Sequence, residues 1–425
     1  MALAVLDATI ANVALPTISA DLGISSASAV WIVNAYNLTV VTMLLPLSAV
    51  AERVGFRRMF ACGLGLFLCG SLASALAGSL AMLIAARTFQ GVGAATLMCL
   101  FGGLVRNIYP MRMLGRGISV NAMAVGVLTV MGPTIGSAIL SVASWPWIFA
   151  VNVPICLAAF FGVRMLPDVP TTAKPFDWLS ALLCMLALAL FIIGVDHLAA
   201  RPGRALGLMA AAAALGYVLV RRSLQRPAPL VPVDLLRVNT IAYAVAASAL
   251  SFAAQMASFV SLPFYFQQVL QRDHLTTGLL MAAWPLGAAA TAPLAGRLSD
   301  SLSAALLAGI GAAAMGLGLL ALVLLPVDAG LGWVVAAMVV AGVGFGFFQT
   351  PNNRAMLTAA PISRSGAAGG LQAVTRVFGQ SFGTALVALG FGLSASGGPT
   401  HALALGSACA FAALAVNAWR YRRMG

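Results

Sequence analysis

Long apolar segments recur along the whole chain and are separated by short polar stretches. Each is roughly 20 residues long, the length that an α-helix needs to cross the hydrocarbon core of a bilayer. Six segments come first, a pair follows, and six more complete the chain. This pattern predicts an all-α integral membrane protein with 14 transmembrane helices. The approximate ranges are 1–20, 30–50, 59–78, 80–104, 117–140, 147–166, 178–198, 205–221, 240–269, 276–295, 303–325, 331–350, 370–393 and 401–419.

A short repeat relates the first six segments to the last six. Glu52 follows the second segment of the first group, and Asp300, shortly after Gly296, follows the second segment of the last group. Two six-helix halves with a weak internal repeat are typical of alternating-access transporters, with the binding site between the halves. The predicted parts are an N-terminal six-helix bundle (1–166), a two-helix insert with flanking cytoplasmic segments (167–237) and a C-terminal six-helix bundle (238–425).

Composition supports a membrane protein and narrows the classes of partner. Hydrophobic residues make up 61% of the 425 positions and charged residues 8%, whereas a soluble domain carries about 25% charged residues. The net charge of +13 would indicate nucleic-acid binding only if the basic residues shared one solvated face. They are scattered between apolar segments instead. We therefore predict a lipid bilayer as the surroundings and no nucleic-acid partner.

The basic residues also predict the orientation in the membrane. If the N-terminus is cytoplasmic, most Lys and Arg residues fall in inward loops, and only Arg201, Arg204 and Arg272 fall in outward ones. Loops with an excess of Lys and Arg stay in the cytoplasm. Both termini of this multi-pass protein are therefore predicted to face the cytoplasm from the cell (inner) membrane. Arg87 and Arg376 are left within spans.

The first apolar segment carries a carboxylate, Asp7. An ionisable side chain inside a span costs a few kcal/mol or more, and by default it indicates a transport or proton-relay role. The alternative is a structural group satisfied by Asn12 or by a neighbouring helix. Asp7 lies about 9 Å of helix from Met1, which is less than the ~15 Å half-thickness of the hydrocarbon core. Either Asp7 lies shallow on the cytoplasmic side, or residues upstream of Met1 are missing from the sequence, and we favour the second.

Arg87, in the fourth segment, is the candidate partner of Asp7; the alternative is that it only snorkels to an interface or locks two helices together. Arg87, Gln90 and Gly91 share one helical face by their i, i+3, i+4 spacing. A guanidinium within a span needs an anion, and Asp7 is the only intramembrane acid of the first half. A carboxylate that holds either a proton or an organic cation, but not both, is sufficient for exchange. The predicted coupling and substrate-binding residues are Asp7, Arg87, Asn12 and Gln90.

Other polar and aromatic side chains within spans predict a substrate cavity. Glutamines supply neutral polar contacts, whereas Asn34 and Tyr36 could equally form hydrogen bonds between helices. Arg376 is the most ambiguous of them, and Asp300 is its most plausible acidic partner. The candidate cavity residues are Trp31, Asn34, Tyr36, Gln255, Gln349 and Arg376.

The sequence offers no cluster typical of an intramembrane enzyme. It contains a single Glu and three widely separated His residues, so an H-E-x-x-H zinc site cannot form. The six cysteines lie in apolar segments without metal-ligand spacing, which predicts buried unpaired thiols. We therefore expect no enzymatic activity, no cofactor and no metal. The expected partners are protons and a small-molecule substrate, and the expected oligomeric state is a monomer.

Several motifs resemble those of one transporter family. The fourth-segment motif contains Arg87, and the fifth contains the core of an antiporter motif, Gly132-Pro133 followed by Gly136. The loop after the second segment resembles G-x-L-x-D-R-x-G-R-K, with Glu52 in place of the aspartate. The basic and glycine positions of that loop are Arg53, Gly55, Arg57 and Arg58. The similarity runs through 6–16, 31–38, 48–58, 83–93, 132–136, 147–154 and 376–383.

These motifs resemble the 14-helix drug:proton antiporters of the major facilitator superfamily. The resemblance implies the major facilitator fold and proton-driven export of amphipathic, cationic drugs by alternating access. It implies that Asp7 recognises cations and couples protons, that Arg87 takes part in proton transfer, and that the loop 48–58 gates movement between the halves. Export of a neutral or anionic metabolite is the alternative, because such motifs encode coupling better than substrate.

Overall fold

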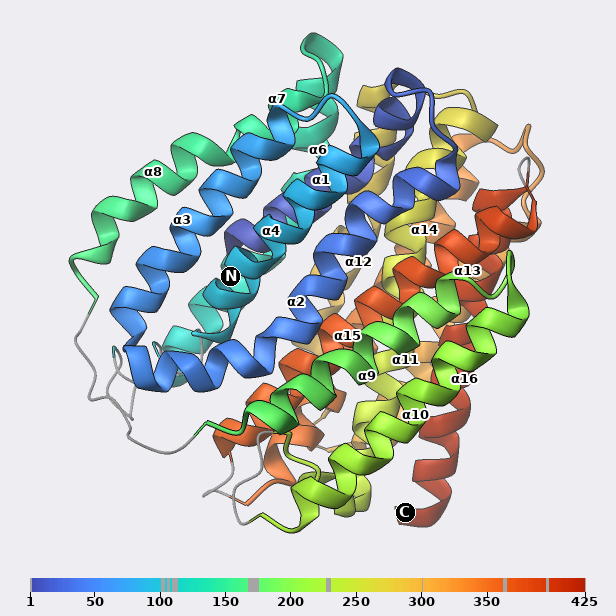
Figure 1. The fold of residues 1–425 in the computed structure, drawn as a ribbon. Helices are drawn as coiled ribbons and strands as arrows, with labels where there is room; N and C mark the ends of the chain where they lie inside the picture. The colour runs from blue at the N-terminus through green and yellow to red at the C-terminus, as the bar shows by residue number, and fades with distance from the viewer. Residues whose placement is uncertain are drawn as a thin grey trace. The chain divides into compact units, whose positions relative to one another are not determined.

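The computed structural model describes residues 2–100, 104, 108, 114–166, 176–226, 231–299, 301–361, 365–394 and 397–424. At residues 2, 114–126, 130, 365, 366 and 424 it describes the backbone. Within these ranges all the regular structure is helical, as Figure 1 shows. The chain divides into two compact units, Met1–Phe191 with Ala210–Val231, and Ile192–Met209 with Pro232–Gly425.

The first unit contains seven helices of its own in the described residues and shares two with the second unit (Figure 1). Its own helices are α1 (Ala2–Asp21), α2 (Ser26–Val54), α3 (Phe56–Ala75), α4 (Leu80–Cys99), α6 (Leu114–Val142), α7 (Pro146–Ala150) and α8 (Asn152–Val163). The shared helices are α9 (Trp178–Asp196) and α10 (Pro202–Leu224).

The second unit begins with a short 3₁₀ turn and continues with long helices. One of them, α11, ends in a π-helical turn, η3 (Tyr265–Val269), so the predicted segment 240–269 is two consecutive helical elements. The elements are η2 (Leu235–Arg237), α11 (Asn239–Phe264), η3, α12 (His274–Leu298), α13 (Ala304–Leu324), α14 (Leu331–Thr358), α15 (Ser365–Leu393) and α16 (Gly398–Met424).

Serine side chains cap the N-termini of three of these helices. The Ser25 hydroxyl accepts a hydrogen bond from the Ser28 backbone N–H at 3.2 Å, and Ser79 accepts one from Met82 at 3.3 Å. Ser303 caps α13 in the same way. Each hydroxyl satisfies a backbone donor that has no partner inside its helix.

Close helix packing in each unit depends on glycine. In the first unit, a Cβ at Gly70 of α3 would lie 2.5 Å from the Gln90 Cβ, so α3 approaches α4 at the turn that carries Gln90. In the second unit, a Cβ at Gly379 of α15 would lie 2.5 Å from the Ala249 carbonyl oxygen of α11. Small residues let backbones approach in this way in membrane helices.

Twelve helices in the described part of the chain are long and apolar enough to cross a membrane, with α7 and α8 together forming one of them. The multi-pass, all-helical prediction is therefore confirmed. The prediction of 14 spans also needs α6 and α15, which are 29 residues each, and that number stays a prediction. So do the domain boundaries at 166 and 237.

Candidate functional site: a buried carboxylate in the first unit

Asp7 is almost completely buried, with 1% of its surface exposed. Its carboxylate accepts hydrogen bonds from side chains of two other helices. Arg87 Nη1 of α4 donates to Oδ2 at 2.6 Å, and Gln90 Nε2, also of α4, donates to Oδ1 at 2.9 Å. Asn152 Nδ2, at the first residue of α8, donates to Oδ1 at 2.6 Å. The carboxylate thus joins α1, α4 and α8.

A fourth helix supports this cluster through one hydroxyl. The Ser71 Oγ of α3 accepts from Gln90 Nε2 at 2.7 Å and from Asn152 Nδ2 at 3.3 Å. Both amides therefore bridge the serine and the carboxylate of Asp7. A side chain one residue earlier would collide with α4, so Gly70 is what lets Ser71 come this close. Hydrogen bonds to Asp7 and to Ser71 therefore fix the orientation of the Gln90 and Asn152 amides.

Arg87 is enclosed by aromatic rings as well as by its acidic partner. Its guanidinium carbon lies 4.2 Å from the centre of the Tyr36 ring and 5.4 Å from that of Phe149. Its Nε donates to the Ile32 carbonyl oxygen at 3.4 Å, and Nη1 also donates to Gln90 Oε1 at 2.5 Å. In the part of the chain that the structure describes, Nη2 has no hydrogen-bond partner. One donor of the buried cation is therefore free for a further acceptor.

The energetics of such a cluster are asymmetric. Removing one partner of a buried ion pair costs about 3–5 kcal/mol, because the other charge is left uncompensated in a poorly solvated place. Protonating the carboxylate has a related effect, because it removes the negative charge while Arg87 stays charged. The charge of Asp7 is therefore part of what holds α1, α4 and α8 together.

The sequence predicted part of this cluster. The structure brings Asp7, Arg87 and Gln90 together. The spacing on the fourth segment predicted that Arg87 and Gln90 share a face, and the scarcity of intramembrane acids in the first half suggested Asp7 as the partner. Asn12 is buried but does not join them, because five residues along a helix turn the side chain about 140° away. Asn152 was not predicted, although it begins an N-x-P sequence at a helix start. Ser71 gave no signal in its apolar segment, since small hydroxyls are common there.

The predicted antiporter motif lies against the helix that carries Asp7. A Cβ at Gly132 of α6 would collide with the Thr9 hydroxyl of α1, and one at Gly136 would lie 3.2 Å from Ile10. Pro133 is buried between them. Helix α6 therefore contacts α1 two and three residues beyond the carboxylate.

The predicted gating loop joins α2 to α3. Gly55 has a φ of +94°, which side chains disfavour and glycine tolerates. The Arg53 guanidinium lies 5.9 Å from the centre of the Phe176 ring, just before α9. Glu52 is exposed at the end of α2. In the second unit, Gly296 lies in α12, and Asp300 falls outside the described residues.

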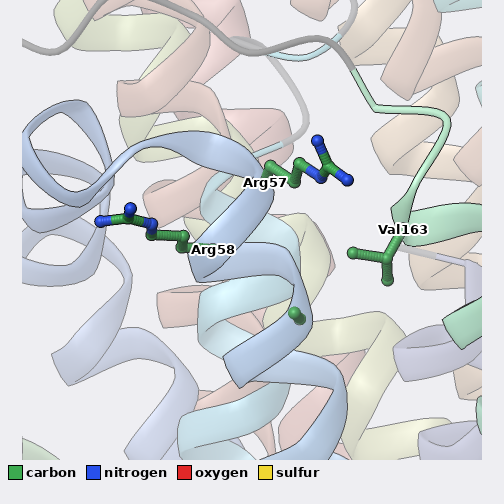
Figure 2. Close-up of a pocket in the computed structure, with 4 residues that line it drawn as sticks. Arg57, Arg58 and Val163 are labelled. Carbon is green, nitrogen blue, oxygen red and sulfur yellow. The ribbon is translucent and has the colours of Figure 1, made fainter.

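A surface pocket opens at the start of α3, away from Asp7. It has a volume of about 370 Å³ and is lined by Arg57, Arg58, Ala61 and Val163. Figure 2 shows the Arg57 side chain on the side of Val163, whereas Arg58 extends to the other side of the helix. None of its lining residues belongs to the Asp7 cluster, so we do not treat this pocket as the substrate site.

The predicted cavity residues fall in both units. On α2, Trp31 is half-buried and Asn34 is buried, with neither amide atom of Asn34 bonded to any described residue. The Tyr36 hydroxyl donates to the Ala4 carbonyl oxygen at 3.3 Å. In the second unit the candidates are all half-buried; they are Gln255 on α11, Gln349 on α14 and Arg376 on α15.

The second unit has a buried polar cluster of its own. Asn352 of α14 donates to the Ala244 carbonyl oxygen at 2.9 Å and to the Ser248 hydroxyl at 2.8 Å, both on α11. Arg420 of α16 donates to Asn352 Oδ1 at 3.2 Å and is only 3% exposed. An amide, rather than a carboxylate, accepts from this arginine.

An ion-paired clasp holds the ends of α9 and α10 that lie in the first unit. Asp177 pairs with Arg222 and with Arg226, each at 3.0 Å, and accepts from the Ser180 hydroxyl at 2.6 Å. Burial raises the pKa of Asp177, but the hydrogen bonds from Ser180 and Arg222 outweigh it and hold that pKa below its ordinary value. The carboxylate is therefore charged at neutral pH.

Comparison with known proteins finds a matching family model and several similar transporters. Residues 1–384 match the model of the Major Facilitator Superfamily. Uncharacterized transporter YebQ of Escherichia coli (strain K12) is 46% identical over 396 residues, covering 92% of this chain and 86% of that protein. Riboflavin transporter RibZ of Clostridioides difficile (strain 630) is 30% identical over 383 residues, covering 89% and 83%.

A drug-resistance protein and a solved structure are also similar. Multidrug resistance protein B homolog of Mycobacterium tuberculosis (strain ATCC 25618 / H37Rv) is 31% identical over 396 residues, covering 90% of this chain and 73% of that protein. The crystal structure of a POT family transporter in complex with a thioalcohol conjugated peptide has a TM-score of 0.74 at 16% identity, covering 100% of this chain and 96% of that chain. At that identity the likeness is one of fold.

Proposed function

The chain belongs to the major facilitator superfamily of membrane transporters, and from this premise we propose that it is a proton-coupled exporter. In this proposal the protein exchanges protons for amphipathic compounds, cationic ones first of all, and moves them out of the cell by alternating access. The family is one of transporters, which typically have no enzymatic activity.

The observation that carries the proposal is the carboxylate of Asp7, held by Arg87, Gln90 and Asn152. An acidic side chain inside a membrane bundle is expensive and is retained for function. Its partners come from two helices other than its own, so its charge state bears on how three helices pack. That is the property that a coupling group needs.

The exchange follows from competition for one negative charge. When Asp7 is ionised, Arg87 and the two amides occupy its oxygens. When a proton binds, the carboxyl becomes neutral and the guanidinium loses its ion pair, which favours a rearranged contact between α1 and α4. A cationic substrate competes in the same way, because it can replace Arg87 at the carboxylate only while no proton is bound.

The remaining parts are assigned by the same proposal. Helices α6 and α15 are the two further spans, which gives 14 with both termini in the cytoplasm of a monomer. The six-plus-two-plus-six division falls at residues 166 and 237. Glycines of α6 permit α1 and α6 to slide, since no side chain separates them at Gly132 and Gly136. The proposed gating residues are Glu52, Arg53, Gly55, Arg57, Arg58, Gly296 and Asp300.

A second candidate is export of a neutral or anionic metabolite. The relative named a riboflavin transporter shows that the family's members differ in substrate. Within this chain, helices α11–α16 contain no Asp or Glu at all. A cation would therefore find no acidic contact on α11–α16, and this observation favours the second candidate.

Two aspartates of α1 provide a matched test of proton coupling. The purified protein is placed in proteoliposomes that contain a pH-sensitive dye, and ethidium is added under an imposed pH gradient. We expect the wild type to exchange protons for ethidium and Asp7→Asn to lose the exchange. Asp21 ends the same helix and accepts from the Trp145 indole at 2.6 Å, so Asp21→Asn is the control.

The control should keep its exchange rate within about twofold, the effect usual for an exposed substitution. Proton exchange by Asp7→Asn at the wild-type rate would contradict the assignment of Asp7. If the wild type moved no organic cation and released no protons on addition of any, the exporter proposal itself would be wrong.

A further inference from the structure

Arg376 lies well inside α15, far from both ends of the helix. It comes 11 residues after Ser365 and 17 before Leu393, or about 17 Å and about 26 Å along the axis. One turn further on, Gly379 and Gly383 pack against the backbone of α11, at Ala249 and Ala253. This packing fixes the position of α15 against α11, and therefore the position of Arg376 along the second unit.

A polar stripe passes through this arginine. Gln372, Arg376 and Gln380 follow one another at intervals of four residues, so they lie along one side of α15. All three are half-buried, whereas Thr375, between them in the sequence, is 4% exposed. The stripe is therefore only partly covered by the rest of the described chain.

Among the residues that the structure describes, Arg376 has no acidic partner; Asp300, its predicted partner, falls outside them. No Asp or Glu occurs in α11–α16, and the acids of the second unit lie at the end of α9 or in connecting segments. In the part of the chain that the structure describes, no side chain pairs with the Arg376 guanidinium or bonds to it. The side-chain amides of Gln372 and Gln380 are likewise unbonded there.

Another arginine of the second unit, Arg420, does have a hydrogen-bond partner. Arg420 is more deeply buried and donates to the amide oxygen of Asn352 at 3.2 Å. Arg376 instead keeps all five N–H donors available among the described residues. Ionisable groups within membrane bundles are costly and characteristically face a pathway for substrate or ions. An unpaired guanidinium with flanking amides is suited to a planar anion, which it binds through two parallel hydrogen bonds.

We propose that Arg376 binds an acidic group of the transported compound, a carboxylate, sulfonate or phosphate, and that Gln372 and Gln380 donate to the same group. The inference rests on the proposed function and narrows its substrates. Among amphipathic compounds with a cationic centre, those that also carry an acidic group are preferred over simple cations. The second unit thus selects for negative charge on the transported compound.

The test uses two dyes that differ in one group: a zwitterionic rhodamine with a free carboxylate, and its cationic methyl ester. Uptake of each is measured in everted membrane vesicles under a proton gradient. We expect the wild type to prefer the acid. Arg376→Gln should lower the rate for the acid by about tenfold to a hundredfold, the range for loss of a charge-assisted hydrogen bond, and should leave the ester unchanged.

Two further variants separate binding from structure. Arg376→Lys keeps the charge and should retain part of the preference for the acid. Arg354→Gln removes an exposed arginine of the same unit that donates to Ser299 at 3.0 Å, and it should leave both dyes unaffected. Fluorescence anisotropy of each dye with the purified variants reports binding without transport.

The inference is overturned if the wild type handles the two dyes equally, or if Arg376→Gln slows both to the same extent, as an arginine that only stabilises the bundle would. These outcomes can be told apart from failure of the proposed function. If the proposed function is wrong, the wild type will show no exchange of protons for ethidium. If only the inference about Arg376 is wrong, that exchange will persist and Arg376→Gln will not change the preference between the two dyes.

Discussion

Among the residues that the structure describes, each unit buries one arginine almost completely, and the two arginines differ in the group that accepts hydrogen bonds from them. In the first unit Arg87 is 0% exposed and donates to the carboxylate of Asp7 at 2.6 Å. In the second, Arg420 is 3% exposed and donates to the amide of Asn352 at 3.2 Å. Both arginines join helices that are far apart in the sequence. Only the acceptor in the first unit can take up a proton.

The two buried clusters are built alike, but the carboxylate of Asp7 can change its charge and the amide of Asn352 cannot. An amide has the same charge at every cellular pH, so the contacts around Asn352 are permanent. A carboxylate can take up a proton, so under the proposed function the contacts around Asp7 are the ones that respond to protons.

The largest effect that the comparison predicts is on stability. Arg87→Ala should lower the free energy of unfolding by about 3–5 kcal/mol, because it leaves a buried carboxylate without its counter-charge. Arg420→Ala should cost less, about 1–3 kcal/mol, because it leaves only a neutral amide oxygen without a donor. Titration of the purified variants with a denaturing detergent, followed by tryptophan fluorescence, measures both.

Arg87→Lys is the matched control for charge. It retains a cation for Asp7 but loses the planar fork that also reaches Gln90 and the Ile32 carbonyl, so its loss should fall between zero and that of Arg87→Ala. A larger loss for Arg420→Ala than for Arg87→Ala would refute the distinction between the two clusters.

A smaller effect concerns the glycines that hold α6 on α1 and α15 on α11. The three atoms nearest to a Cβ at Gly383 are all backbone atoms of Ala253, whereas one at Gly132 would meet the Thr9 hydroxyl, which can rotate away, and the Thr9 Cβ at 2.8 Å, which cannot. Gly383→Ala should therefore lower the free energy of unfolding by about 1–3 kcal/mol, the usual cost of overpacking. Gly132→Ala should lower it by less.

Gly369→Ala provides the control on α15, because no atom lies within 4 Å of the added carbon. Thermal unfolding in detergent should show it as stable as the wild type or slightly more so. Equal losses for Gly132→Ala and Gly383→Ala would mean that Thr9 cannot yield, which would make the two helix contacts equally rigid.

Much of the fold could be predicted because bilayer thickness sets the length of apolar segments. The sixth segment was predicted as one span, and the structure divides it into α7 and α8 at Val151. The length of an apolar segment does not indicate where a helix breaks. The break is important because α8 then begins at Asn152, whose amide donates to Asp7. Hydrophobicity therefore located the helix and missed its functional residue.

The candidate site shows the same limit at the level of single contacts. The Asp7–Arg87 pair was predictable because charges are so scarce in the spans that each must find the other. Ser71 and Asn152 are neutral, and many neutral polar residues occur in the spans. Which of them meets the carboxylate depends on how α3 and α8 are rotated, and this depends on close contacts such as that at Gly70. Sequence periodicity does not determine those rotations.

The smallest expected effect is at the clasp between α9 and α10. The carboxylate of Asp177 pairs with Arg222 and Arg226, which are 31% and 44% exposed, so Asp177→Asn should cost at most about 1 kcal/mol.

The pKa of Asp177 lies below its ordinary value in the folded protein. Its contribution is therefore complete above the unfolded-state value of about 3.9 and is lost as the pH falls through the lower folded-state value. Thermal unfolding of wild type and variant at neutral pH and at about pH 2 should show a difference that disappears in acid. A difference that persists there, or one as large as that for Arg87→Ala, would mean that the clasp is held by something other than its charges.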